Sequence, residues 1–162
     1  MKSLPENYRI GEKFGKTYLD NYFSKTFNLT SGNTDFEGTD LESSDNCIGV
    51  YVRTRFEPYK DVTFNGEQAL KKLVKNLNKY DKYYILLQHA RGKSLDDPNF
   101  KVYYQGIIDL NTFTQDILEK DSKLSIDILK NNFKLRTKKE TNKNFYVWET
   151  WKKYVVVEEY IG

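Results

Sequence analysis

A continuous apolar segment near the middle of the chain most strongly limits the folds that this chain can adopt. The segment KYYILLQHA, residues 82–90, has the length of a β-strand and is apolar without interruption from Tyr83 to Leu87. Such a run is typical of a central strand that is buried within a sheet. We therefore expect a sheet built around this strand, with helices packed on it.

Two segments show the periodicity of amphipathic helices. The first, residues 7–27, has apolar residues every four positions starting at Ile10. The second, residues 65–80, has leucines on one face and lysines over much of the remainder. Gly11 and Gly15 lower the helix propensity of the first segment, and close packing would explain their presence.

The remaining apolar segments favour strands. An antiparallel hairpin is expected over residues 35–56, because the turn residues SSDN separate two strand-like runs. Residues 100–110 predict another strand, and residues 144–151 and 153–161 predict a C-terminal pair of strands, with a hairpin as one arrangement. The intervening segments are expected to be loops (56–66 and 134–144) or short helices (111–121 and 122–133).

The predicted fold class is mixed α/β, or α+β, in a single domain over residues 1–162. Its parts are a central mixed sheet, an N-terminal helix, a β-hairpin, a crossover helix and the C-terminal pair of strands. One cysteine, Cys47, excludes an internal disulfide and a cysteine-based zinc site, and one histidine, His89, excludes a histidine cluster. We expect His89 to have a structural role.

The chain lacks the features of a membrane or secreted protein. Its N-terminus has no apolar signal core, and no segment approaches the roughly 18 apolar residues of a membrane-spanning helix. A cytoplasmic protein without a membrane partner is therefore expected. The net charge is only +3, so a nucleic-acid partner would require a local basic patch.

Acidic residues cluster just before a strand that carries two arginines. The cluster consists of Asp35, Glu37, Asp40, Glu42 and Asp45. Residues two apart on a strand share a face, so Asp40 and Glu42 can point together, as can Tyr51, Arg53 and Arg55. Carboxylates beside cations can hold Mg²⁺ and stabilise charge on a phosphate. The same residues can also form ordinary surface ion pairs across a hairpin.

The order of these segments resembles the core of the PD-(D/E)XK nuclease superfamily. A helix containing IGEKF precedes GTD, which enters a strand; the strand IGVYVRTR, a helix and the buried strand YYILLQHA follow. The later VYYQGIIDLNTF is similar to the segment that often follows that core, so the resemblance covers about residues 7–120. It implies a restriction-endonuclease-like fold and Mg²⁺-dependent endonuclease activity on DNA.

The resemblance also implies roles for individual residues. Asp40 would bind the metal, and Glu12 matches an extra acid that some members contribute. Tyr51 and Arg53 occupy the family's Glu or Gln and Lys positions, but a neutral phenol is a weak ligand and arginine does not readily shuttle protons. In an alternative register, Glu42 or Asp35 is the second acid. Without a second acid, the domain would keep the nuclease-like fold but lack nuclease activity. The predicted catalytic residues are Asp40, Glu42 and Arg53, and the predicted Mg²⁺ ligands are Glu12, Asp35, Asp40 and Glu42.

Basic residues on the second helix and in the 134–144 loop are candidates for DNA contacts, although each set is also typical of a solvated surface. The predicted contacts are Arg55, Lys71, Lys75, Arg136, Lys138 and Lys139. Three hypotheses follow. The protein cuts DNA, as a homodimer or in a larger nuclease complex; it is a catalytically inactive DNA-binding or protein-interaction module; or it is an assembly protein.

Overall fold

The structure is a computed structural model that describes residues 10–30, 39–57, 62–94, 96–114, 143–146 and 152–161. Its elements are α1 (Ile10–Phe23), β1 (Phe27–Leu29), β2 (Leu41–Ser43), β3 (Ile48–Phe56), β4 (Val62–Asn65), α2 (Gly66–Lys79), β5 (Lys82–Arg91), β6 (Lys101–Asp109), β7 (Lys143–Tyr146) and β8 (Val155–Tyr160). Residues 110–114 are also helical. No helix in these described ranges is long and apolar enough to cross a membrane.

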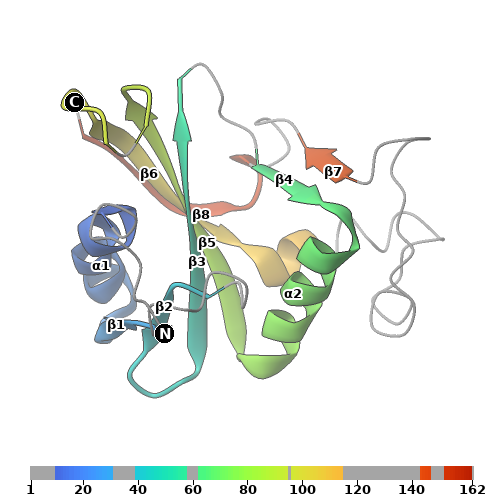
Figure 1. Cartoon of the computed structure of the whole chain (residues 1–162). Helices are drawn as coiled ribbons and strands as arrows, with labels where there is room; N and C mark the ends of the chain where they lie inside the picture. The colour runs from blue at the N-terminus through green and yellow to red at the C-terminus, as the bar shows by residue number, and fades with distance from the viewer. Residues whose placement is uncertain are drawn as a thin grey trace, which may run out of the picture.

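A six-stranded mixed sheet forms the centre of the fold, which confirms the predicted mixed α/β class. The strands lie in the order β1-β2-β3-β5-β6-β8. β3 and β5 run parallel, and α2 lies in the connection between them, whereas the other neighbouring strands are antiparallel. α1 and α2 lie on opposite sides of this sheet (Figure 1).

The face of the sheet toward α1, here called the α1 face, carries much of the apolar core. Leu19 of α1 is fully buried in a cluster with Val50 of β3 and Leu86 of β5. Gly15 allows this close approach, because a Cβ atom there would collide with the Leu86 side chain. A Cβ on Gly11 would lie 2.7 Å from both Thr54 Oγ1 and Gln88 Oε1. Helix packing therefore explains both glycines.

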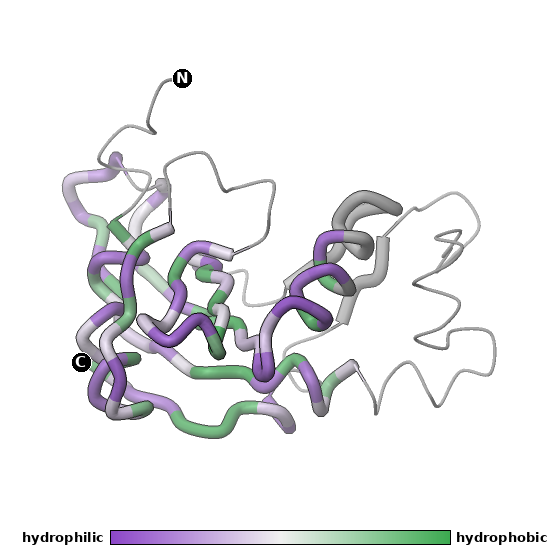
Figure 2. The backbone as a smooth tube through the Cα atoms, turned by 90° about the horizontal axis from the view of Figure 1, so that it is seen from below, coloured by the Kyte–Doolittle hydropathy of each residue, from purple (hydrophilic) through white to green (hydrophobic). Residues whose placement is uncertain are grey.

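The opposite face, here called the α2 face, carries the other side chains of β3 and β5. A Cβ on Gly49 would lie 2.5 Å from the ring of Tyr80, which directly follows α2. Alternation along β3 places Tyr51, Arg53 and Arg55 on this same face. The coloured part of α2 is largely hydrophilic in Figure 2, and Lys75 and Lys79 are exposed.

Several element boundaries differ from the sequence-based predictions. α1 ends at Phe23 rather than residue 27, because Ser24 adopts a φ of 52° and the Asp20 carboxylate accepts a hydrogen bond from Phe27 N at 2.7 Å. The chain then forms β1, which the sequence did not predict. The expected loop 56–66 contains β4.

The C-terminal strands do not pair with one another. β7 pairs with β4 in a separate two-stranded sheet, and β8 adds to the central sheet beside β6. A hairpin was therefore the wrong arrangement for this pair. The described helical turn at 110–114 agrees with the helix predicted from residue 111, whereas the predicted helix at 122–133 lies outside the described residues.

Candidate functional site

Tyr51 interacts with both kinds of side chain predicted for a phosphate site, a carboxylate and arginines. The guanidinium of Arg53 donates a hydrogen bond to the Tyr51 hydroxyl, and Asp40 and Arg55 also affect the pKa of this phenol. Burial is the main reason that the pKa of Tyr51 is raised; the charge of Arg53 opposes this rise, and Asp40 adds to it. Tyr51 is therefore a neutral phenol at pH 7. Its hydroxyl is hydrogen-bonded to Arg53, and the negative charge of Asp40 acts on it through space.

Asp40 is held by the backbone of β3. Its N–H donates to Val50 O at 2.8 Å, and its Oδ2 accepts a hydrogen bond from Val52 N at 2.8 Å. The carboxylate thus continues the β2–β3 ladder beyond Leu41, where β2 begins. Since it satisfies an edge N–H group, Asp40 has a structural role whatever its chemistry.

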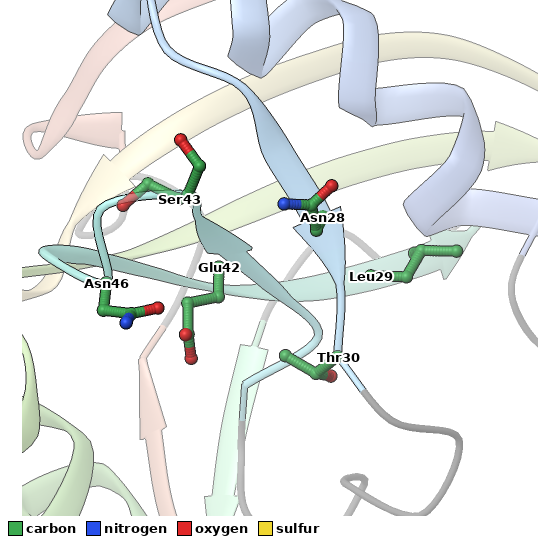
Figure 3. Close-up of a pocket in the computed structure, with 7 residues that line it drawn as sticks. Asn28, Leu29, Thr30, Glu42, Ser43 and Asn46 are labelled. Atoms are coloured by element: carbon green, nitrogen blue, oxygen red, sulfur yellow. The ribbon is translucent and has the colours of Figure 1, made fainter.

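The carboxylate of Glu42 is also hydrogen-bonded within the protein. Its Oε2 accepts a hydrogen bond from the Tyr80 hydroxyl at 2.6 Å. It borders a surface hollow of about 330 Å³ beside the β1–β2 hairpin, where its carboxylate lies among polar side chains (Figure 3). The hollow is lined by Asn28, Leu29, Thr30, Glu42, Ser43, Ser44 and Asn46. Among the described residues that line it, Glu42 contributes the one carboxylate.

A buried polar network lies behind Asp40. Thr39 Oγ1 donates to Asn76 Oδ1 at 2.5 Å, and Asn76 Nδ2 donates to Lys72 O at 2.7 Å. Tyr83 shares a hydrogen bond with Thr39, and burial, with a smaller effect from Asp40, raises the pKa of Tyr83 well above its usual value. The sequence pattern did not predict this network. Its available signal was Asn76, a polar residue on the helix stripe that also carries Leu73 and Tyr80.

The three predicted metal ligands that the structure describes, Glu12, Asp40 and Glu42, are not brought together as a group. Glu12 is buried on α1, which packs on the α1 face, across the sheet from Tyr51 and Arg53. Asp35 lies outside the described residues. Within the described ranges, no group of three or more Asp, Glu, His or Cys side chains is arranged to hold a metal ion. Glu12, Asp40 and Glu42 therefore do not form the predicted Mg²⁺ centre by themselves.

The predicted DNA contacts are only partly described. Arg55 is half-buried on β3, and Lys75 is exposed on α2. Lys71 belongs to α2, but the structure does not describe its side chain. Arg136, Lys138 and Lys139 lie outside the described residues.

The polar residues of β5 contribute to packing. His89 is 3% exposed and stacks on Tyr104 with a ring-centroid distance of 4.8 Å, which agrees with a structural role. Gln88 is fully buried; it accepts a hydrogen bond from Thr54 Oγ1 at 2.8 Å and donates one to Gly11 O at 2.9 Å. These contacts tie α1 to the sheet.

Comparisons with protein-family models, curated proteins and solved structures gave no match to this chain. The resemblance to PD-(D/E)XK nucleases therefore stays a prediction.

Proposed function

We propose that this domain binds DNA through the phosphate backbone, with Arg53 and Arg55 as the central contacts. The observation that supports this most is that Arg53 and Arg55 share the α2 face with the neutral phenol of Tyr51, to which Arg53 is hydrogen-bonded. Arginine has five N–H donors in a planar fork that matches phosphate oxygens. One bond to Tyr51 orients the Arg53 side chain and leaves other donors for a phosphate.

Local charge supports the same proposal. The net charge of +3 is too small for the whole surface to attract a polyanion, so binding depends on a patch. Lys75 and Lys79 are exposed on α2, the helix that follows the same face. Each lysine or arginine that contacts a phosphate adds affinity that decreases with salt.

Metal-dependent cleavage is a second candidate, favoured by the position of Asp40, which is hydrogen-bonded to Val52 N on β3, the strand that also carries Tyr51 and Arg53. Mg²⁺ commonly uses one or two carboxylates, with water and substrate phosphates completing its shell. Asp40 and Glu42 would be the ligands, but each already accepts a hydrogen bond from the protein. A bound ion would supply Lewis-acid activation of the phosphate. Because the described donor set is this small, we favour DNA binding without cleavage.

The direct test measures the affinity of the full chain for labelled DNA at several salt concentrations, by fluorescence anisotropy. We expect log K to fall linearly with the logarithm of the salt concentration. Incubation of the same DNA with Mg²⁺ or Mn²⁺, and with EDTA as the control, should leave it intact. Cleavage that needs the metal and is lost in Asp40→Asn would favour the second candidate, whereas undetectable binding at low salt together with intact DNA would refute both.

A further inference from the structure

We propose that the DNA bound by the α2 face is single-stranded, with a base stacked on Tyr160 while Arg55 holds a phosphate. This inference rests on the proposed function and specifies its substrate. It comes from one row of residues that crosses four strands of the sheet.

The row begins at Arg55 and ends at Tyr160. Arg55 is in register with His89, His89 with Tyr104, and Tyr104 with Tyr160. Directly paired residues share a face, so all four lie on the α2 face. Because neighbouring strands are about 4.8 Å apart, the row spans about 14 Å. A short single strand can reach both ends.

Packing fixes the middle of this row. The Tyr104 ring packs between two other rings. Its centroid lies 4.8 Å from that of His89 and 5.0 Å from that of Tyr160. His89 and Tyr104 are 3% and 1% exposed, but Tyr160 is 67% exposed. The Tyr104 hydroxyl donates to Glu158 Oε2 at 2.8 Å, and its ring lies over Gly106, where a Cβ would be 2.5 Å from the hydroxyl oxygen. The exposed ring of Tyr160 therefore rests on a rigid aromatic base.

The two ends of the row suit different parts of a nucleotide chain. An exposed aromatic ring can stack on any base, but only where the base is free of the duplex. The carboxylate of Glu158 lies next to this ring system and disfavours a phosphate there, whereas it does not prevent stacking of a neutral base. Phosphate binding is favoured at Arg55, beside Arg53. The arrangement combines a stacking surface with basic residues, as single-strand binding requires.

The test compares the affinity of the full chain for a labelled oligothymidine strand and for a duplex of equal length, at the same ionic strength. We expect tighter binding of the single strand. Tyr160→Ala should lower this affinity about fivefold or more, and Tyr160→Phe, which keeps the ring, should retain it. Tyr22→Ala is the matched control, because Tyr22 is an exposed tyrosine on α1, on the other side of the sheet.

The outcomes separate this inference from the proposed function. Equal affinity for the two DNA forms, or unchanged single-strand affinity in Tyr160→Ala, would overturn the stacking inference, while duplex binding that depends on Arg53 would still support the proposed function. No binding to either form would overturn both. If Tyr160→Ala fails to fold by circular dichroism, photocrosslinking of the wild-type chain to a 5-iodouracil strand decides: an adduct at Tyr160 is expected, and adducts only elsewhere would overturn the inference.

Discussion

The carboxylate of Asp40 accepts a hydrogen bond from the backbone N–H of Val52 at a distance of 2.8 Å. This contact extends the pairing of the hairpin one step beyond β2, and it fixes the carboxylate at the edge of β3 beside the α2 face. The residue that the sequence proposes as a metal ligand thus also stabilises the sheet. Its substitution affects folding and function together.

The first prediction separates these two roles of Asp40. Asp40→Ala should lower the free energy of unfolding by about 1–2 kcal/mol, because the Val52 N–H loses its acceptor. Asp40→Asn keeps an acceptor oxygen and should retain most of that stability while removing the charge. Urea unfolding of both variants measures the difference. Equal losses would show that the charge, and not the hydrogen bond, supplies the stability.

The second prediction concerns the close packing of Gly49 and Tyr80. Gly49→Ala should destabilise the fold by about 1–3 kcal/mol, because the new methyl group would displace the Tyr80 ring. That displacement would also break the hydrogen bond from Tyr80 to Glu42.

A double-mutant cycle tests this mechanism. In a Tyr80→Ala background, which removes the ring, Gly49→Ala should lower the free energy of unfolding much less than it does in the wild type. If the two substitutions are additive, the ring is not the source of the constraint on Gly49.

The third prediction is a change in stability at alkaline pH. Burial, with smaller effects from Glu159 and Glu158, raises the pKa of Tyr18 to about 12 from its usual 10. A raised pKa in the folded state gives stability that is present below pH 10 and is lost as the pH rises toward 12. Tyr18→Phe should reduce this loss in thermal melts between these pH values. An unchanged alkaline profile would contradict this role.

Tyr18→Phe also has an expected effect at neutral pH. The Tyr18 hydroxyl is buried, and it neither accepts nor donates a hydrogen bond within the described part of the chain. Removing it should therefore leave stability unchanged or increase it by about 1 kcal/mol. A marked loss of stability at pH 7 would show that the hydroxyl has a favourable contact.

The features that the sequence predicted correctly depend on local pattern. The apolar run from Tyr83 to Leu87 became the central strand, with both faces covered. Alternation in β3 correctly separated Val50, in the α1-face core, from Tyr51 and Arg53. The turn residues after β2 correctly located the hairpin.

The features that were missed depend on contacts between distant segments. β4 forms because Val62–Asn65 pairs with Lys143–Tyr146, a partner far along the chain. β8 joins β6 rather than β7 for the same reason. Local propensity cannot select among such partners, because tertiary packing decides them.

The candidate site was predictable in part. Strand alternation correctly grouped Tyr51, Arg53 and Arg55, but it could not show that α1 packs on the other face and carries Glu12 away from Tyr51 and Arg53. Nor could it show that Tyr80 engages Glu42 or that Val52 engages Asp40. Those contacts join residues from elements whose relative positions the sequence pattern leaves open.

The central claim is that Arg53 and Arg55 hold DNA phosphates, and the salt dependence of DNA affinity in Arg53→Gln tests it most directly. Each lost phosphate contact should reduce the slope of log K against log salt concentration by about one and weaken binding. Lys13→Gln, which removes one charge from the exposed surface of α1, is the matched control and should behave as the wild type. If Arg53→Gln remains folded and binds DNA with the affinity and salt slope of the wild type, the proposed phosphate contact is wrong.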